Sequence, residues 1–284
     1  MNKIFILLPV RNRRNITNRF IQCLKSQTYK NCHLILIDDG STDGTDEMVR
    51  SEIKAVTVIK GQGNWWWGGA LQQGFLWLKS QKVDPSDLVL LINDDTEFEI
   101  HFLERARAIL DGKAKTMLFA QNIGRQTSRP MLGFRADWRR LKIETVTTPG
   151  KIDCCSTRGL FMRAEDFFRI GGFHPHLLPH YGSDTEFTLR ARRKGMNLVT
   201  DPSLRLYFDE ETSGFEPLPS ASLTEFLKIY FSKKSRHNPL MWTMFILLVC
   251  PWKWKLINCG RVWVGAGVHI WRHLTARRQV GDQA

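Results

Sequence analysis

The sequence predicts an α/β protein in which a mainly parallel, Rossmann-like sheet is flanked by helices. Apolar runs of strand length alternate with amphipathic, helix-length segments through the first 92 residues. Polar residues gather directly after each apolar run. Because alternating strands and helices favour parallel strands joined by crossover helices, the sequence indicates a sheet with helices on both faces.

Each expected element follows from its pattern of apolar residues. Ile16, Phe20, Ile21 and Leu24 recur at helical spacing, whereas the run before Val10 is continuously apolar. We expect strands at 3–10, 33–37, 55–59 and 87–92, separated by helices at 16–27, 45–51 and 68–79. Beyond Asp111 the pattern is less regular, and we expect strands at 116–121, 139–146 and 159–162 and a helix at 183–194.

Composition limits the class of protein. With 284 residues and 43% hydrophobic content, the chain can bury a large core. The first ten residues contain one Lys and lead through Pro9 into Arg and Asn residues, so we expect a strand there and no signal peptide. The six cysteines form no CxxC pair and lack a histidine at zinc spacing, which favours free thiols in a reducing cytosol.

The positive charge is concentrated near the C-terminus. The formal net charge is +13, and residues 228–278 contain ten Lys or Arg and no Asp or Glu, which leaves +3 for the rest. Because a nucleic-acid binder usually carries its basic face on the folded domain, we expect no nucleic-acid partner. We therefore divide the chain into a domain at 1–215 and a basic, Trp-rich helical tail at 216–284.

Two carboxylates follow the second expected strand. Asp38 and Asp39 precede Gly40 and the start of a helix. Ligands of such sheets bind beyond the carboxyl ends of the strands, and carboxylates there can accept hydrogen bonds from a nucleoside. An ordinary capped turn explains the same residues equally well.

A second acidic pair, Asp94 and Asp95, follows the apolar strand at 87–92. Adjacent carboxylates repel one another unless a cation or solvent neutralises them. Their hard oxygen atoms favour Mg²⁺ or Mn²⁺, which would bridge to a diphosphate. A solvated loop is the alternative.

A third acidic segment begins the helix expected at 183–194. Asp184 lies in its first turn, where the helix dipole and free amides favour a carboxylate. Such a residue can act as a general base toward an acceptor hydroxyl, and a helix cap with a surface Glu is the alternative.

Three consecutive tryptophans, 65–67, precede the helix expected at 68–79 and lie among glycines. Glycines let the backbone approach a ligand, and flat aromatic rings suit sugar faces. We expect core packing for at least one of the three, and assign it to Trp66.

In their order along the chain, these segments resemble the inverting family 2 glycosyltransferases with the GT-A fold, including rhamnosyltransferase-like enzymes of bacterial polysaccharide synthesis. The resemblance runs from about residue 3 to residue 213. It rests on five local matches: Leu8-Pro9-Val10-Arg11-Asn12, Asp38-Asp39-Gly40-Ser41, Asn93-Asp94-Asp95, the loop 158–163 that continues to Gly171-Gly172-Phe173, and Gly182-Ser183-Asp184.

The resemblance implies a role for each matched residue. Asp184 would be the catalytic base, and Asp95 would bind Mg²⁺ or Mn²⁺. The donor nucleotide sugar would contact Pro9, Arg11, Asn12, Asp38, Asp39, Asn64, Gly69 and Asp94. The sugar or acceptor loop would include Arg158, Gly159 and Trp65. Two positions depart from the family pattern: Ser183 stands where an acid is usual, and Phe208 stands where members often carry a histidine metal ligand.

The implied reaction moves a sugar with inversion from a UDP-, dTDP- or GDP-linked donor to a hydroxyl of a glycan or lipid-linked acceptor in cell-surface polysaccharide synthesis. A nucleotidyltransferase is one alternative, although a Gly-rich basic loop is missing between Pro9 and Arg14. An inactive membrane-bound scaffold is another, against which the intact Asp94, Asp95 and Asp184 count.

The tail predicts attachment to a membrane surface. The apolar segment 240–250 has only 11 residues, too few to cross a bilayer. Trp and Lys alternate at 252–255, followed by Trp263, Trp271, Arg272, Arg277 and Arg278, a composition typical of helices that lie on anionic membranes. We expect a cytoplasmic protein, peripheral on the inner face of the cell membrane. Helices packed on the domain or on a homodimer partner are the alternative.

Overall fold

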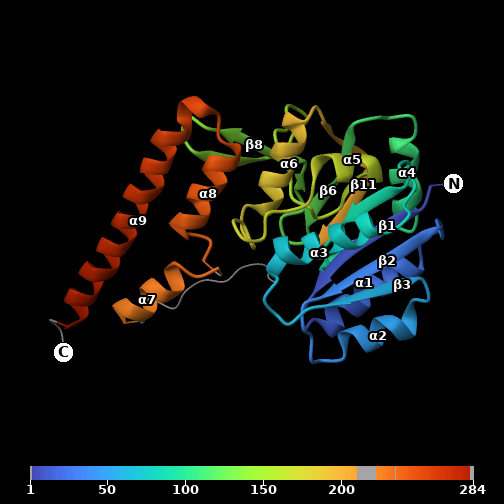
Figure 1. The fold of residues 1–284 in the computed structure, drawn as a ribbon, viewed down its shortest axis with the longest axis horizontal. Helices are drawn as coiled ribbons and strands as arrows, with labels where there is room; N and C mark the ends of the chain where they lie inside the picture. The colour runs from blue at the N-terminus through green and yellow to red at the C-terminus, as the bar shows by residue number, and fades with distance from the viewer. Residues whose placement is uncertain (1, 210–221, 234, 282–284) are drawn as a thin grey trace.

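The computed structural model describes residues 2–209, 222–233 and 235–281. One large sheet organises the structure (Figure 1). Its strand order is β3–β2–β1–β4–β10–β6–β11–β5, and β7 pairs with β6 at the side of this path. The strands are β1 (Ile4–Val10), β2 (Cys32–Asp38), β3 (Val56–Lys60), β4 (Leu88–Leu91), β5 (Thr96–Phe98), β6 (Thr116–Gly124), β7 (Pro130–Met131), β10 (Leu160–Arg163) and β11 (Asn197–Phe208).

The first half of the sheet is parallel, as the alternation of strands and helices predicts. Strands β3, β2, β1 and β4 run in the same direction. Strand β10 is antiparallel to both β4 and β6, β11 is parallel to β6, and β5 is antiparallel to β11. The carboxyl ends of β1, β2 and β4 therefore lie at one edge of the sheet, where the predicted site residues follow.

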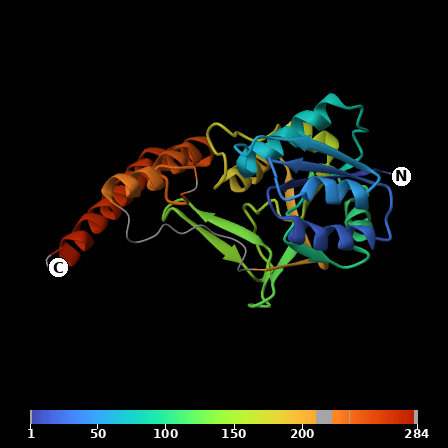
Figure 2. The same cartoon turned by 90° about the horizontal axis from the view of Figure 1, so that it is seen from below.

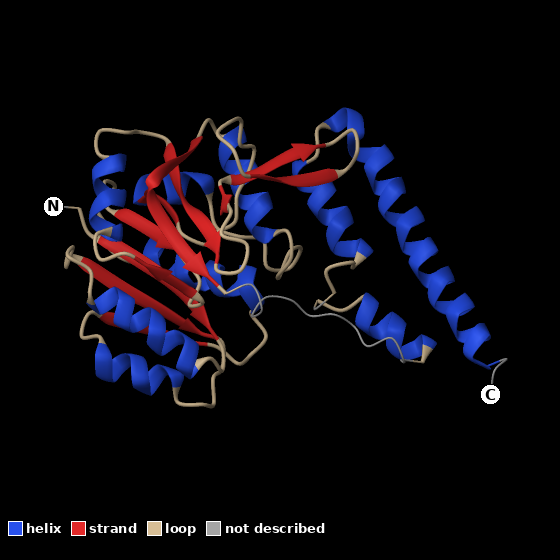
Figure 3. Ribbon diagram, turned by 180° about the vertical axis from the view of Figure 1, so that it is seen from behind, coloured by secondary structure: helices blue, strands red, loops and turns tan. Residues whose placement is uncertain are grey.

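Helices cover both faces of this sheet (Figure 3). Every residue of β1 is buried, and its side chains alternate between two clusters: Ile4, Ile6 and Leu8 belong to one, and Phe5 and Leu7 to the other. The first cluster includes residues of α1 (Arg14–Lys25), α2 (Thr45–Glu52) and α4 (Phe102–Leu110), and the second includes residues of α3 (Trp66–Ser80), α5 (Ala164–Ile170) and α6 (Ser183–Arg193).

A hairpin replaces the single strand expected at 139–146. Its strands are β8 (Gly133–Asp137) and β9 (Lys142–Val146), which pair in an antiparallel sheet of their own. The turn is built by Asp137, whose Oδ1 accepts the backbone N–H groups of Arg139 at 2.9 Å and Arg140 at 3.1 Å. The predicted strand started at residue 139, whereas β9 starts at Lys142. The residues between Asp137 and Lys142 belong to the turn, which their side chains did not reveal in the sequence.

Three helices follow the described part of the domain: α7 (Leu223–Tyr230), α8 (Pro239–Val249) and α9 (Trp252–Gly281). They lie to one side of the large sheet, and the β8–β9 hairpin extends towards them (Figures 1 and 2). A third cluster joins Phe245 and Ile246 of α8 to Leu178, with Trp138 of the hairpin packed against it. Among the described residues after 221, helices α8 and α9 pack against Leu178 and against Trp138 of the hairpin.

Two predictions about the tail concern its ability to cross a membrane and its boundary with the domain. In the parts of the chain that the structure describes, no helix has both the length and the apolar content required to cross a membrane. The domain boundary expected between 215 and 216, and the side chains of Arg277 and Arg278, lie outside the described residues. The six cysteines are all free, as expected.

Candidate active site

The loop after β1 and the turn after β2 are tied together. The backbone N–H of Asn12 donates to Ser41 Oγ at 2.9 Å, and Asn12 Oδ1 accepts the N–H of Thr42 at 2.8 Å. Asp38 is buried, and its Oδ1 accepts the N–H of Ser41 at 2.8 Å. Three of the residues predicted to contact the donor, Arg11, Asn12 and Asp38, thus lie at adjacent strand ends.

The carboxylate of Asp39 organises the loop that leads into α3. Its Oδ1 accepts the N–H groups of Gly63 and Asn64 at 2.8 and 3.1 Å, and its Oδ2 accepts those of Trp65 and Trp66 at 2.9 and 3.1 Å. Four charge-assisted hydrogen bonds fix the start of the helix, where N–H groups lack helical partners. Direct contact between Asp39 and a nucleoside stays a prediction.

The remaining residues of this loop also lie close to the β2 turn. Arg11 Nη1 donates to the carbonyl oxygen of Gly63 at 2.6 Å. A Cβ atom at Gly40, whose φ is +76°, would lie 2.9 Å from the backbone nitrogen of Gly63. Asn64 is exposed, and Gly69 is buried in the first turns of α3. The close approach of the two loops therefore requires Gly40.

The acidic pair after β4 faces two arginines. Asp94 Oδ2 accepts the hydroxyl of Thr17 at 2.8 Å, and Asp94 Oδ1 lies 3.2 Å from Arg13 Nε. Asp95 Oδ2 lies 3.8 Å from Arg13 Nη2 and 3.4 Å from Arg158 Nη2. Burial raises the pKa of Asp94 to about 6, an effect that the Arg13 guanidinium opposes.

The donor set at this pair suits a divalent cation only in part. Within the described residues, no group of three or more His, Cys, Asp and Glu side chains is arranged to hold a metal. Two histidines that precede α6 do not complete such a group: His174 Nε2 lies 3.8 Å from Glu186 Oε1, and the centroid of the His180 ring lies 5.8 Å from that of the Trp66 ring. The carboxylates of Asp94 and Asp95 fit Mg²⁺ or Mn²⁺ when ligand oxygens and water complete the coordination.

Phe208, at the end of β11, contacts Arg158. The centre of the guanidinium lies 4.2 Å from the centroid of the phenyl ring, a cation–π geometry. Gly159 follows with a φ of +82°, and a Cβ atom there would lie 2.3 Å from Leu206 Cδ2. The position where the resemblance leads us to expect a histidine therefore orients Arg158 toward Asp95.

Asp184 lies in the first turn of α6, after Gly182 in the left-handed conformation. Asp184 Oδ1 accepts the indole N–H of Trp67 at 2.7 Å, and Oδ2 accepts the backbone N–H of Thr157 at 3.2 Å. Burial raises the pKa of Asp184, and the N–H of Thr157 is the first of the groups that oppose this rise. A raised pKa makes a carboxylate a stronger proton acceptor, as a general base requires.

A continuous set of contacts joins the three acidic segments. Asp39 binds the backbone that leads into Trp67, Trp67 donates to Asp184, and Asp184 binds Thr157, whose neighbour Arg158 contacts Asp95. These residues come from five separate stretches of the sequence, and the contacts bring them together.

Some of the residues in these contacts were not predicted from the sequence. Arg13, Thr17 and Thr157 were not singled out, although Arg13 follows directly on the predicted Arg11 and Asn12. The assignment of core packing to Trp66 was wrong: Trp65 and Trp67 pack against the core, and Trp66 adopts a positive φ of 59°. Periodicity gave no help, because the three tryptophans straddle the end of a loop and the start of α3.

Other predicted residues lie in β1 and at the start of α3. Pro9 is buried in β1, where it pairs with Ile37 of β2, two positions before Arg11. Trp65 is half-buried. A Cβ atom added at Gly69 would lie 3.2 Å from the Cβ atom of Trp65. The roles assigned to these residues stay predictions.

Residues 5–167 match the family model described as Glycosyl transferase family 2. This match covers more than half of the chain, and the chain belongs to that family. Its fold is of the GT-A type. The resemblance noted in the sequence is thereby confirmed, and so is the α/β fold class. The comparison with curated proteins gives no match.

Solved structures share the fold at low sequence identity. GalNAc-T7 with UDP, GalNAc and Mn²⁺ has a TM-score of 0.60 at 14% identity over 80% of this chain, which spans about half (48%) of the GalNAc-T7 chain. The mannosyltransferase PcManGT from Pyrobaculum calidifontis, in complex with GDP-Man and Mn²⁺, has a TM-score of 0.53 at 13% identity. The match covers 98% of this chain and 80% of the PcManGT chain. TarS 1–349 from S. aureus has a TM-score of 0.56 at 17% identity, over 90% of this chain and 68% of the TarS chain.

Proposed function

We propose that the protein transfers a sugar, with inversion, from a nucleoside-diphosphate sugar to a hydroxyl group of an acceptor glycan. The contact path from Asp39 through Trp67 to Asp184, and from Thr157 to Asp95, is the observation that carries this proposal. It brings a candidate base and a candidate cation site into one constellation. Similar structures that contain UDP or GDP-Man support a UDP-, dTDP- or GDP-linked donor.

The proposed mechanism is a single displacement. Asp184 takes the proton of the acceptor hydroxyl while the hydroxyl oxygen attacks the anomeric carbon of the donor sugar. The bond from that carbon to the diphosphate breaks, and the configuration inverts. Trp67 and Thr157 hold the two carboxylate oxygens of Asp184 in place. The removal of such a base lowers turnover by about 10²–10⁴-fold.

Two arginines would bind the leaving diphosphate, and two carboxylates would hold a cation beside it. Arg13 and Arg158 place two positive charges beside Asp94 and Asp95, and both guanidinium groups can donate to phosphate oxygens. Asp95, with Asp94 beside it, would hold Mg²⁺ or Mn²⁺, and the bound cation would neutralise charge on the diphosphate.

The tail supports a location at a membrane surface. Large apolar side chains of α9 are exposed, among them Trp252 at 86%, Leu256 at 87%, Val264 at 69% and Trp271 at 63%. Lysines and arginines lie between them, as in helices that lie in the headgroup region of anionic membranes. We place the protein on the inner face of the cell membrane with a lipid-linked acceptor for cell-surface polysaccharide synthesis. The same exposed surface would suit a homodimer.

A donor screen tests the proposed reaction. UDP-, dTDP- and GDP-sugars are offered with Mn²⁺, with Mg²⁺ or with EDTA, and thermal stabilisation and release of the nucleoside diphosphate are measured. We expect one donor to stabilise the protein in the presence of a cation and to be hydrolysed slowly. The Asp184→Asn variant should keep the stabilisation and lose the hydrolysis.

Other results would support the competing functions. Release of inorganic diphosphate from a nucleoside triphosphate in the presence of a sugar phosphate would indicate a nucleotidyltransferase. Donor binding by the wild-type chain without hydrolysis or transfer to any acceptor extract would indicate an inactive scaffold. If no donor stabilises the protein under any of the three conditions, the proposed function is wrong.

A further inference from the structure

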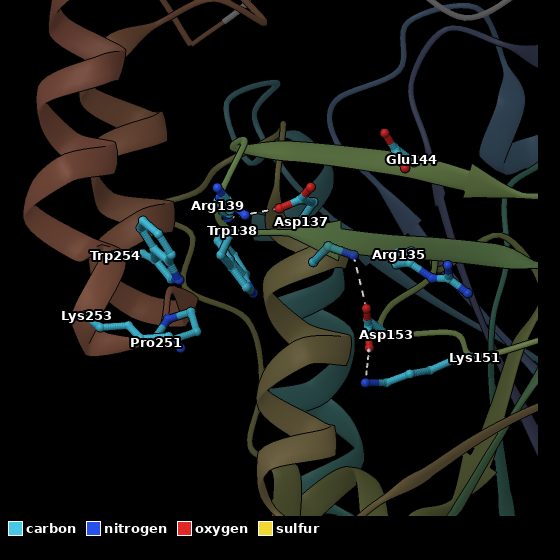
Figure 4. Close-up of a pocket in the computed structure, with 11 residues that line it drawn as sticks. Arg135, Asp137, Trp138, Arg139, Glu144, Lys151, Asp153, Pro251, Lys253 and Trp254 are labelled. Atoms are coloured by element: carbon cyan, nitrogen blue, oxygen red, sulfur yellow. Dashed lines mark hydrogen bonds and ion pairs between the residues drawn. The ribbon is translucent and has the colours of Figure 1, made fainter.

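Two neighbouring cavities lie between the β8–β9 hairpin and the C-terminal helices, away from the acidic segments described above. Trp138 lines both of them. The first has a volume of about 700 Å³ and is shown in Figure 4. The rings of Trp138 and Trp254 lie on its helical side, and Arg135 and Lys151 lie on the opposite side (Figure 4). Its size is that of a small-molecule site.

The first cavity has an excess of available positive charge. Two of its acids are already engaged: Asp137 accepts two backbone N–H groups of the hairpin turn, and Asp153 pairs with two cations. Across the described parts of the chain, Arg135, Arg139 and Lys253 form no ion pair. The charged residues of the lining are Arg135, Arg139, Lys151, Lys253, Asp137, Glu144 and Asp153. The free guanidinium and ammonium groups favour an anionic ligand.

The second cavity is mainly apolar. Its volume is about 410 Å³, and it lies between the hairpin, α7, α8 and α9. Lys142, Arg261 and two histidines are its basic residues, and the rest of the lining is largely aliphatic and aromatic, with Leu141, Ile143, Trp242, Phe245 and Val262. An apolar chain would remove this surface from water.

The lining of each cavity is linked to an element that positions the candidate base, the first through the chain and the second through a contact. Asp153 lines the first cavity, and the segment that follows leads to Thr157, whose N–H binds Asp184. On the other side, a Cβ atom at Gly182, the residue before α6, would lie 3.3 Å from Cδ2 of Phe245, which lines the second cavity. A ligand held in the two cavities is therefore anchored to the elements that position Asp184.

We propose that these cavities bind the carrier of the acceptor glycan, a lipid diphosphate, with its diphosphate group in the first cavity and the start of its hydrocarbon chain in the second. Charge complementarity selects the headgroup, the apolar lining selects the chain, and Trp138 lies where the two meet. The exposed Trp252 and Leu256 of α9 flank Lys253, so the basic cavity borders the surface that we assign to the membrane. This inference rests on the proposed transferase function and names the class of its acceptor.

Direct binding to the full chain tests the inference. Farnesyl diphosphate, inorganic diphosphate and farnesol are titrated separately in calorimetry. We expect farnesyl diphosphate to bind at least tenfold more tightly than either fragment, because only it fills both cavities. The Arg135→Ser/Arg139→Ser variant should weaken its binding at least tenfold. Ile143→Glu, a change at a partly exposed cavity wall, should remove the preference over inorganic diphosphate.

A matched variant controls for loss of positive charge. Arg19 and Lys54 are exposed on the domain, and Arg19→Ser/Lys54→Ser should bind farnesyl diphosphate like the wild type. Equal binding of farnesyl and inorganic diphosphate would overturn the inference, and so would unchanged binding by the cavity variants. A dimer in sedimentation that dissociates when Ile143 is replaced by Glu would also overturn it, since a second chain would then fill the cavities.

The donor screen separates this inference from the proposed function. A protein that hydrolyses a nucleotide sugar but shows no preference for farnesyl diphosphate keeps the function and loses the lipid site. A protein that binds farnesyl diphosphate through Arg135 and Arg139 but neither binds nor hydrolyses any donor keeps a lipid site and loses the function.

Discussion

Replacing Trp67 by Phe isolates the hydrogen bond that the indole N–H donates to the candidate base. The bond joins Trp67 Nε1 to Asp184 Oδ1 at 2.7 Å, and the same N–H also lies 3.0 Å from Thr157 Oγ1. Phe keeps most of the ring packing and removes the donor. A hydrogen bond to a charged group contributes about 1.5–3 kcal/mol, and 1.36 kcal/mol corresponds to one pH unit.

The sign of the effect follows from the state that the bond favours. Asp184 accepts a proton only as a carboxylate, so activity falls as the pH drops through its pKa. Burial already raises that pKa, and the Trp67 N–H stabilises the ionised form. Without this donor the pKa of Asp184 rises further, and the acidic limb of the kcat/KM profile should move upward by about one to two pH units.

The assay is a pH–rate profile of sugar transfer with the donor identified by the screen. Trp67→Phe should lose most activity at acidic pH and retain it at alkaline pH, with an unchanged donor KM. Trp77→Phe is the matched control, because Trp77 lies on the same helix, packs against the same core cluster and stacks on His33. An equal loss of activity at every pH, or an identical shift in the Trp77 variant, would refute the role of the hydrogen bond.

Three further changes test the loop, the strand end and the cation site. Asp39→Ala leaves four backbone N–H groups without their acceptor and should lower the free energy of unfolding by about 3 kcal/mol or more in urea titration; a loss under 1 kcal/mol would contradict the anchoring role. Gly159→Ala adds backbone strain and a clash with Leu206, so it should cost about 2–5 kcal/mol, whereas Gly112→Ala, at a φ of +65° with open space, should cost only about 1–2 kcal/mol; equal losses would exclude the clash. Asp95→Ala should abolish the extra thermal stabilisation that Mn²⁺ gives the donor-bound protein, and a full Mn²⁺ response in this variant would place the cation elsewhere.

Local sequence patterns were sufficient for the parallel half of the sheet. The run from Ile4 to Val10 is apolar at every position because both faces of β1 are covered, and such a run is visible without knowledge of the partners. The antiparallel direction of β10 was not visible, since a buried strand has the same composition in either direction. The hairpin turn at Asp137 was missed because its hydrogen bonds, and not a glycine, define it.

The acidic positions of the site were also visible, but their partners were not. Asp39 follows a predicted strand, and Asp184 lies at the start of a predicted helix. In a sheet of alternating strands and helices, such positions face the ligand. The sequence does not show that both carboxylate oxygens of Asp39 accept backbone N–H groups. It also does not show that Trp67 donates a hydrogen bond to Asp184, which lies 117 positions further along the chain. Such contacts depend on how α3 and α6 pack, which is a property of the whole fold.

Phe208 shows how one departure from the family pattern acquires a physical meaning only in three dimensions. An imidazole at this position would carry a nitrogen lone pair that can bind a metal ion. The phenyl ring instead carries no lone pair, and its face stabilises the guanidinium that lies 4.2 Å from it. Arg158 is thereby held 3.4 Å from Asp95, so the end of β11 contributes positive charge through a neighbouring arginine. The electrostatic environment of the acidic pair thus depends on Phe208, although this side chain carries no charge.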